Sequence, residues 1–445
     1  MLNLFDSYTT QSRDLHFSLL LAGYKHPTVA IRDDGWLPAD VESPLKFMFE
    51  QAGVQLSGKG RYFNQIDVPH FWEIDASGND GRVLDKGQLR AHLNYVRQDN
   101  TRLVRFVEWY DRAGRIRLIE GYNQWGWKFR QTVRNAAGQD MVTTYLTDQG
   151  AEVLTENHVT GVLIYNDPKG KKRFFKDWPA LVSYYLRQAG FDLKRMVINS
   201  LGAPFFTLLQ VLDATEQNYL FWQEELQGGI PGNMQFILDG NAGKTQVVVQ
   251  QRRVFDQIEG LLAPNNRKKV SYLGYSYPFA RLNQGHRVAV TFTNSDQVEK
   301  ITELITALPE ITFNIAAGTE MSGKLTALDR FSNVNLFPTV SGANIRLLMK
   351  EADLYLDINR GNEIFDAVRG AFENNMVIMG FADTLHQARY VAKENTFQEE
   401  QVDQMVAKLK KVTEDPQELE KTLQAQWQHA DRGLPKDYQA LLGKL

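Results

Sequence analysis

Apolar and polar residues alternate with two different periods along the last third of the chain. Residues 354–358 form an alternating, β-prone run, and a polar loop containing glycine follows at residues 359–361. Apolar side chains then recur at helical spacing over residues 364–372, and a second apolar run occupies residues 376–379. A strand, a loop, a helix and a second strand in this order predict a βαβ unit of a parallel sheet.

The same alternation of strands and helices begins upstream of this unit. It predicts strands at residues 288–292, 311–316 and 334–337, with helices at residues 296–307 and 324–329 between them. Together with the βαβ unit, these elements predict a doubly wound domain built on a parallel sheet.

The N-terminal residues predict a second α/β region. Thr9 or Thr10 can cap a helix with one apolar face, and Gly23 can end it. A buried-type strand follows at residues 27–31. Strands alternating with helices return only from about residue 176 onward, so this region is interrupted.

Residues between about 50 and 167 have a different character, because turn-forming residues separate short alternating runs. We expect an antiparallel meander with one apolar and one polar face, with strands at residues 101–110, 115–120, 121–133 and 141–146. Trp125, Trp127 and Phe129 share one face of the predicted strand. Aromatic residues in this pattern are typical of a core, and a sugar-stacking platform is the alternative.

A chain of 445 residues is too long for one ordinary core. We predict a first Rossmann-like domain split between residues 1–49 and 177–265, with an extended β-sheet domain at residues 50–176 inserted into it. A second Rossmann-like domain is predicted at residues 266–415. Helical patterns continue into residues 416–445, which we expect to form a tail that crosses back onto the first domain.

Composition and charge exclude several classes of function. A net charge of −3 gives no reason to expect nucleic-acid binding. The absence of cysteine excludes disulfides, thiol catalysis and cysteine-ligated metals, and suits a reducing cytosol. No segment reaches the roughly 20 apolar residues that cross a bilayer, and the N-terminal residues lack the basic region of a secretory signal. We therefore expect a cytoplasmic protein.

Motifs for metals and cofactors are incomplete. The eight histidines show no HxH, HxxxH or HExxH spacing, and neither GxGxxG nor GxSxG is present. Residues 239–245, DGNAGKT, are similar to a phosphate-binding loop, but Leu238 stands where its first glycine belongs and a strand-like run follows. We interpret this segment as a hairpin turn and expect neither a metal nor a cofactor.

Residues 169–176, with the sequence KGKKRFFK, are locally basic. One interpretation is a solvated hairpin end in which Phe174 and Phe175 pack into the core. The other is a contact with a membrane surface or a partner through Lys171, Lys172 and Arg173, because clustered basic residues attract anionic lipids. Both interpretations can hold at once.

Three segments carry a family resemblance: FWQEELQGGIPGNM at residues 221–234, YLGYSYPF at residues 272–279 and ADLYLDIN at residues 352–359. They resemble the GtfB family of glycosylation-stabilising subunits of accessory-Sec systems, and the similarity extends over essentially the whole chain. Individually, related motifs also occur in the catalytic partner of that family and in teichoic-acid glycosyltransferases.

The resemblance implies a GT-B-like α/β fold, with two Rossmann-like domains and an antiparallel β-sheet domain inserted into the first. It also implies a cytoplasmic complex with a catalytic O-GlcNAc transferase subunit (GtfA). The acceptor implied is a Ser/Thr-rich polypeptide, that of a serine-rich-repeat adhesin. The basic run adds a peripheral position on the inner face of the cell membrane to this expectation.

The resemblance also shows which catalytic groups are missing. Retaining GT-B enzymes usually hold two glutamates eight residues apart in the βαβ unit, and these positions fall on Asn362 and Gly370. An Arg and a Lys commonly neutralise the leaving phosphate, and their positions fall on Asn294 and Glu299. We therefore assign no catalytic residue.

Three functions remain. The favoured one is a non-catalytic subunit that stabilises a protein O-GlcNAc transferase complex and binds its acceptor. The alternative is an active retaining glycosyltransferase that uses UDP-GlcNAc, with the neighbouring Lys300 and Glu363 as substitutes for the missing groups. The third is a purely structural interaction protein.

The acceptor would lie in the cleft between the Rossmann-like domains, where ligands bind outside the carboxyl ends of parallel strands. Polar side chains at two such ends suit a neutral, extended, Ser-rich peptide whose hydroxyls and amides need partners. The expected acceptor-binding residues are Asn294, Ser295, Arg360, Gly361, Asn362 and Glu363.

Overall fold

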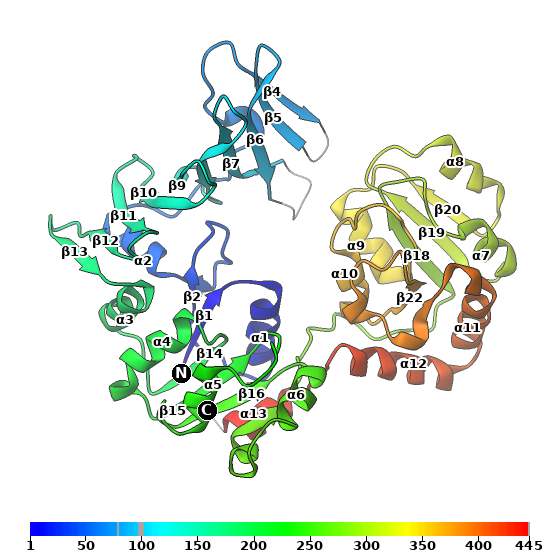
Figure 1. Ribbon diagram of the computed structural model, residues 1–445. Helices are drawn as coiled ribbons and strands as arrows, with labels where there is room; N and C mark the ends of the chain where they lie inside the picture. The colour runs from blue at the N-terminus through cyan, green and yellow to red at the C-terminus, as the bar shows by residue number, and fades with distance from the viewer. Residues whose placement is uncertain (78–79, 97–101, 444–445) are drawn as a thin grey trace. The chain divides into compact units, whose positions relative to one another are not determined.

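A computed structural model describes residues 1–77, 80–96 and 102–443 (Figure 1). Its contacts divide the chain into two compact units, Met1–Gly274 with Gly443, and Tyr275–Leu442. The first unit holds a parallel and an antiparallel sheet, and the second holds a parallel sheet. The predicted α/β class with an inserted antiparallel sheet is confirmed. The finer division into domains stays a prediction.

The parallel sheet of the first unit has the strand order β17-β16-β15-β14-β1-β2-β3. Most residues of its central strands are apolar and buried, as is typical of a parallel sheet covered on both faces. The strands are β1 (Leu2–Ser7), β2 (Thr28–Arg32), β3 (Val41–Glu42), β14 (Arg195–Ile198), β15 (Gln217–Trp222), β16 (Thr245–Val249) and β17 (Val270–Tyr272). The helices are α1 (Thr10–Leu21), α2 (Pro44–Gln51), α3 (Trp178–Gln188), α4 (Ala203–Gln210), α5 (Gly232–Leu238) and α6 (Arg252–Glu259).

Local signals set the ends of these elements. Thr9 caps α1 by accepting a hydrogen bond from the Ser12 amide at 3.2 Å, and Gly23 follows the helix with φ +96°. Both features were predicted. Residues 239–245 join α5 to β16, which runs parallel to β15, so the predicted hairpin turn is wrong. A strand does follow this turn, as expected.

The antiparallel sheet lies in the chain between β3 and β14 and has ten strands in sequence order, with β4 and β13 at its edges (Figure 1). The strands are β4 (Glu73–Ser77), β5 (Asp80–Asp85), β6 (Gln88–Tyr95), β7 (Val104–Tyr110), β8 (Ile116–Tyr122), β9 (Lys128–Arg134), β10 (Asp140–Leu146), β11 (Glu152–Asn157), β12 (Leu163–Asn166) and β13 (Lys172–Phe175). Near β4 the sheet has its own core, which includes Val83, Leu93 and Val107. Phe129, Leu154 and Leu163 join the core of the parallel sheet.

A single strand was predicted over residues 121–133, but the chain turns there. The Asn123 side chain accepts backbone hydrogen bonds from Trp125, Gly126 and Trp127 at 3.0–3.2 Å. Such local side-chain bonds compete with strand pairing, so β8 ends at Tyr122 and β9 begins six residues later. Trp125 therefore lies in the turn and not on the predicted strand face.

The second unit is doubly wound, with the strand order β20-β19-β18-β21-β22-β23. The strands are β18 (Val288–Thr293), β19 (Thr312–Ala317), β20 (Val334–Phe337), β21 (Leu354–Asp357), β22 (Val377–Phe381) and β23 (Thr396–Phe397). The helices are α7 (Ile301–Ala307), α8 (Gly323–Thr326), α9 (Gly342–Glu351), α10 (Ala367–Glu373), α11 (Val402–Glu414), α12 (Pro416–His429) and α13 (Pro435–Leu442). The predicted βαβ unit is confirmed as β21, α10 and β22. The helix predicted from residue 296 begins at Ile301, because the preceding residues form a loop.

Candidate functional site

The polar residues singled out in the sequence meet at one place in the second unit. β18 and β21 are neighbours, and the chain continues from them to opposite sides of the sheet. Such a switch point is where doubly wound sheets bind ligands, outside the carboxyl ends of the strands. Asn294 and Ser295 follow β18, and residues 360–363 follow β21, so the structure brings the two predicted groups together.

Asn359 connects these two groups and is 2% exposed. Its side-chain oxygen accepts hydrogen bonds from the Thr293 hydroxyl at 2.9 Å and from the Gly361 amide at 3.0 Å. Its amide nitrogen donates to the Asn294 side chain at 3.5 Å and to the Asn362 carbonyl at 3.4 Å. Sequence reasoning placed this residue in the loop but missed its role. In the sequence, the only sign of this role is a single Asn at the end of a strand.

The two loops pair with each other across the switch point. The Glu299 amide donates to the Ile358 carbonyl at 2.8 Å, and the Arg360 amide donates to the Gln297 carbonyl at 2.9 Å. Gly361 lies so close to Asn294 that a Cβ atom would overlap the amide oxygen of that side chain. The two loops therefore hold each other at the carboxyl ends of β18 and β21, beside an open groove of about 500 Å³ that Lys300, Lys324 and Arg360 help to line.

Basic side chains at this edge are paired within the chain. The Arg360 guanidinium bonds the carboxylates of Glu299 and Glu399, the latter at 2.9 Å. Lys300 lies 3.2 Å from the Glu303 carboxylate and 3.7 Å from that of Glu399, and the bond to Glu303 raises the pKa of Lys300. Carboxylates already neutralise the two cations that could stabilise a leaving phosphate.

Glu363 supports the loop that enters α10. Its carboxylate accepts a hydrogen bond from the Val368 amide at 3.0 Å and two from the Gln387 side chain at 2.9 Å. Burial raises the pKa of Glu363. Since its oxygens bind the N-terminal turn of a helix, the residue has a structural function that a catalytic nucleophile would not need.

His386 fixes the β21 loop from the side of β22. Its Nδ1 lies 2.6 Å from the Asp357 carboxylate and its Nε2 lies 2.7 Å from the Gly361 carbonyl oxygen. Asp357 is 1% exposed, and its bond to the imidazole raises the pKa of His386 to about 9. With acceptors at both nitrogens, the ring is an imidazolium at neutral pH and donates at both ends.

Backbone strain also gathers along this edge. Lys300, Thr339, Phe365 and Asp366 all have φ between +50° and +63°, and each lies in a loop after a strand of the second sheet. Such conformations cost about 1 kcal/mol or more in non-glycine residues and cluster at functional sites.

Only part of the predicted acceptor-binding set is accessible. Asn294, Arg360 and Asn362 are exposed. Polar side-chain atoms form ion pairs or hydrogen bonds within the chain in Arg360, Ser295 and Glu363. Asn362 is thus the predicted residue best placed to bind an external peptide.

The basic residues at 169–176 differ in exposure and pairing. Lys171 and Lys172 are exposed, whereas Arg173 bonds the Asp167 carboxylate at 3.1 Å and stacks on Tyr184. Phe175 packs against the core as expected, but Phe174 is 67% exposed and does not. The two residues point to opposite faces of β13 because strand side chains alternate.

No group of three or more His, Asp or Glu side chains in the described part of the chain could hold a metal ion.

The sequence matches four family models in order: the GtfB N-terminal domain (residues 2–48), middle domain (72–176) and third domain (179–261), and the GftB/GlyA-F C-terminal domain (289–426). The UDP-N-acetylglucosamine–peptide N-acetylglucosaminyltransferase stabilizing protein GtfB of Streptococcus gordonii is 38% identical over 100% of this chain and 99% of its own length. The chain belongs to the GtfB family.

Solved structures agree with membership of the GtfB family. A chain in the crystal structure of a GtfA/B complex bound to UDP and GlcNAc is 38% identical, with a TM-score of 0.91 and coverage of 99% of both chains. The pneumococcal O-GlcNAc transferase GtfA, in complex with UDP and GlcNAc, is 12% identical with a TM-score of 0.51, over 99% of this chain and 97% of its own. That second likeness concerns the fold alone. The GT-B-like class is confirmed.

Proposed function

We propose that this chain is a non-catalytic subunit that stabilises a protein O-GlcNAc transferase complex and binds its acceptor polypeptide. The observation that carries the proposal is the set of contacts within the chain at the switch point of the second unit. The loops after β18 and β21 pair with each other, and Arg360 and Lys300 are neutralised by carboxylates. The phosphates of a donor nucleotide sugar would have to compete with these carboxylates for both cations.

Membership of the family supports the remaining parts of the proposal. Relatives are named as stabilizing proteins of a UDP-N-acetylglucosamine–peptide transferase, and a similar chain occurs in a GtfA/B complex. We infer that the partner is a catalytic GtfA-type subunit. The acceptor is a Ser/Thr-rich adhesin that is modified in the cytoplasm before accessory-Sec export, so the subunit also acts as a chaperone for it.

The acceptor contacts the strand-end loops, chiefly through Asn362 and Asn294. Replacing Asn362 by Ala is expected to weaken binding of an unmodified Ser/Thr-rich peptide by about 0.5–1.5 kcal/mol, the usual value of one hydrogen bond. The measurement is titration calorimetry on the full chain. Asn344→Ala, an exposed Asn at the start of α9, is the matched control and should bind as the unaltered chain does.

Association with the catalytic subunit is the companion measurement. It should be the same for Asn362→Ala and Asn344→Ala, because neither residue has a packing role. Equal peptide affinity of the two variants would place the acceptor site elsewhere on the molecule.

The alternative, an active glycosyltransferase, would need Lys300 and Glu363 as substitutes. Lys300 is ion-paired to Glu303 and Glu399, and Glu363 bonds Gln387 and the α10 backbone. Using either residue would break contacts that hold the loop together. Turnover by the chain alone is the outcome that would favour this function.

We also propose a peripheral contact with anionic membrane lipid at the β13 edge. Within the described residues, no helix is long and apolar enough to cross a membrane. Of the predicted contact residues, Lys171 and Lys172 are exposed and Arg173 is paired. Each exposed lysine near an anionic surface contributes about 1 kcal/mol.

Liposome pelleting tests this contact. Lys171→Ser with Lys172→Ser is expected to reduce binding to phosphatidylserine-rich vesicles by at least about tenfold. The double variant Lys25→Ser and Lys59→Ser removes two other exposed lysines and should pellet normally. Equal loss in both double variants, or no loss in either, would remove the membrane contact.

A further inference from the structure

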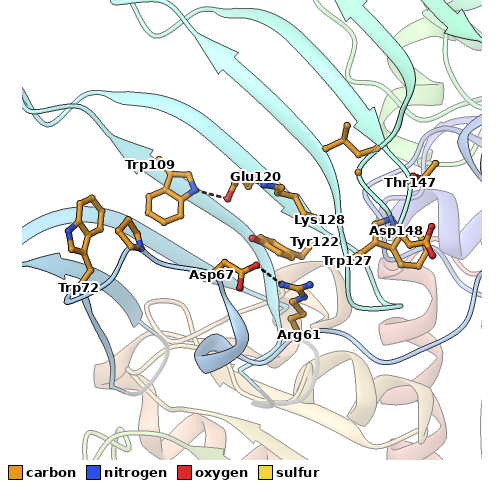
Figure 2. Close-up of a pocket in the computed structure, with 13 residues that line it drawn as sticks. Arg61, Asp67, Trp72, Trp109, Glu120, Tyr122, Trp127, Lys128, Thr147 and Asp148 are labelled. Carbon is orange, nitrogen blue, oxygen red and sulfur yellow. Dashed lines mark hydrogen bonds and ion pairs between the residues drawn. The ribbon is translucent and has the colours of Figure 1, made fainter.

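The antiparallel sheet carries a pocket that the proposed function does not use. The pocket has a volume of about 430 Å³ and is lined by residues of β7, β8, β9 and the loops around them. Figure 2 shows Trp72 and Trp109 at one end, and Trp127 with Asp148 at the other. A concave site with aromatic walls and a few polar groups has the form of a small-molecule site.

One aromatic wall of the pocket, Trp109, is held in place by a buried carboxylate. Glu120 is 7% exposed and accepts hydrogen bonds from the Trp109 indole at 2.8 Å and from the Lys128 ammonium at 2.7 Å. Trp72 and Trp109 lie with ring centroids 6.5 Å apart and both remain partly exposed. The bond to Glu120 fixes the Trp109 ring before any ligand arrives, and the Arg90 guanidinium lies 5.8 Å from the centroid of the Trp72 ring.

One polar group of the pocket has no partner among the described residues. Trp127 is 8% exposed, its ring lines the pocket, and its indole N–H is buried without a hydrogen-bond acceptor. Buried N–H groups nearly always find a partner, since leaving one unpaired costs about 1–3 kcal/mol. Because the indole nitrogen is fully buried, a ligand in the pocket cannot reach this N–H, and Trp127 contributes only its ring to the wall.

The charges of the pocket select among ligand classes. Three carboxylates, from Asp67, Glu120 and Asp148, face two cations, from Arg61 and Lys128. The net charge is negative by one, and Glu120 already neutralises Lys128. This balance disfavours phosphates and nucleotides. A neutral ligand with apolar faces and polar edges fits both the rings and the carboxylates.

We propose that this pocket binds a pyranose sugar residue. The ring C–H face of such a sugar would lie on the indole of Trp72 or Trp109. Its hydroxyls would bond Asp148, an exposed carboxylate at the opposite end. The choice of N-acetylglucosamine as the probe sugar rests on the proposed function. The proposal that the pocket binds a sugar rests on its lining residues.

The test uses the full chain and three ligands: free N-acetylglucosamine, a Ser/Thr-rich peptide, and the same peptide carrying O-linked N-acetylglucosamine. Saturation-transfer NMR is expected to show contact with the sugar ring protons in both sugar-containing samples. Trp72→Ala and Asp148→Ala are each expected to lower the affinity for the sugar about tenfold, the usual effect of losing one stacked ring or one strong hydrogen bond.

Two controls match these variants. Phe174→Ala removes an exposed aromatic residue of the same sheet, and Asp140→Ala removes an exposed carboxylate of it; neither residue lines the pocket. Asp148 lies in an exposed turn, so its variant decides the question if Trp72→Ala fails to fold. Circular dichroism checks folding of all four.

Four results would overturn the proposal. One is the absence of any sugar signal, and another is sugar binding that both pocket variants leave unchanged. A third is a glycopeptide that binds no better than the bare peptide. The last is a loss of affinity for the catalytic subunit, and not for sugar, in Trp72→Ala, which would make the pocket a partner contact. If the unaltered chain does not bind the peptide without sugar, that result would instead contradict the proposed function.

Discussion

Deleting residues 50–176 is expected to abolish co-purification of the chain with its catalytic subunit. The deleted segment contains the ten-stranded sheet, which ends in two open edges at β4 and β13. Open edges present unpaired backbone groups that can pair with a strand of another chain. A stable complex that survives the deletion would show that the main contact lies elsewhere.

A point substitution makes the same test without removing a sheet. Phe71, two residues before β4, is 95% exposed and has φ +70°, an unusual conformation for a large apolar residue. Phe71→Ser is expected to weaken the affinity for the catalytic subunit about tenfold or more, as for a buried aromatic contact at an interface. Val159→Ser alters a residue that is 69% exposed in another turn of the sheet and should leave the affinity unchanged.

Asp357→Ala is expected to destabilise the second unit by about 3–5 kcal/mol at neutral pH, because it leaves the His386 imidazolium without its buried carboxylate. Asp357 is 1% exposed and also accepts a hydrogen bond from the His386 amide at 2.8 Å. The Gly361 loop then loses its anchor, so peptide affinity should fall as well. Asp383→Ala, an exposed carboxylate two residues after β22, is the control.

The destabilisation should depend on pH in a defined direction. The pKa of His386 is raised to about 9 in the folded chain, from an ordinary value of 6.5. Its stabilising contribution is therefore fully present below about pH 6.5 and is lost as the pH rises through about 9. Urea unfolding near pH 6 and near pH 10 should show the difference between the unaltered chain and Asp357→Ala narrowing. A difference that stays constant with pH would mean that the ion pair is not its source.

The sequence predicted elements wherever the determining signal is local. Thr9 and Gly23 mark the ends of α1, and the apolar periods over residues 354–379 mark β21, α10 and β22. These signals act within one or two turns of chain, so spacing alone reveals them. The turn at Trp125, where a continuous strand was predicted, also has a local cause, because the Asn123 side chain accepts hydrogen bonds from the backbone that follows it.

The candidate site was only partly predictable, because its geometry depends on contacts between distant residues. The switch point follows from strand order, and the sequence placed Asn294 and Asn362 there correctly. The His386–Asp357 pair joins residues 29 positions apart, and Asn359 bonds Thr293 across 66 positions. No periodicity reports such pairs. The sugar pocket likewise gathers side chains from several strands and loops, and its rings resemble core residues in sequence.

Turnover by the purified chain is the most direct test of a non-catalytic, acceptor-binding subunit. The chain is incubated with UDP-GlcNAc and an acceptor peptide, with and without the catalytic subunit, and both hydrolysis and transfer are measured. We predict no activity above background for the chain alone and efficient transfer by the complex. Glu363→Ala should leave the chain equally silent, because this carboxylate is bound by Gln387 and the Val368 amide. Robust turnover by the isolated chain that disappears in Glu363→Ala would contradict the proposed function.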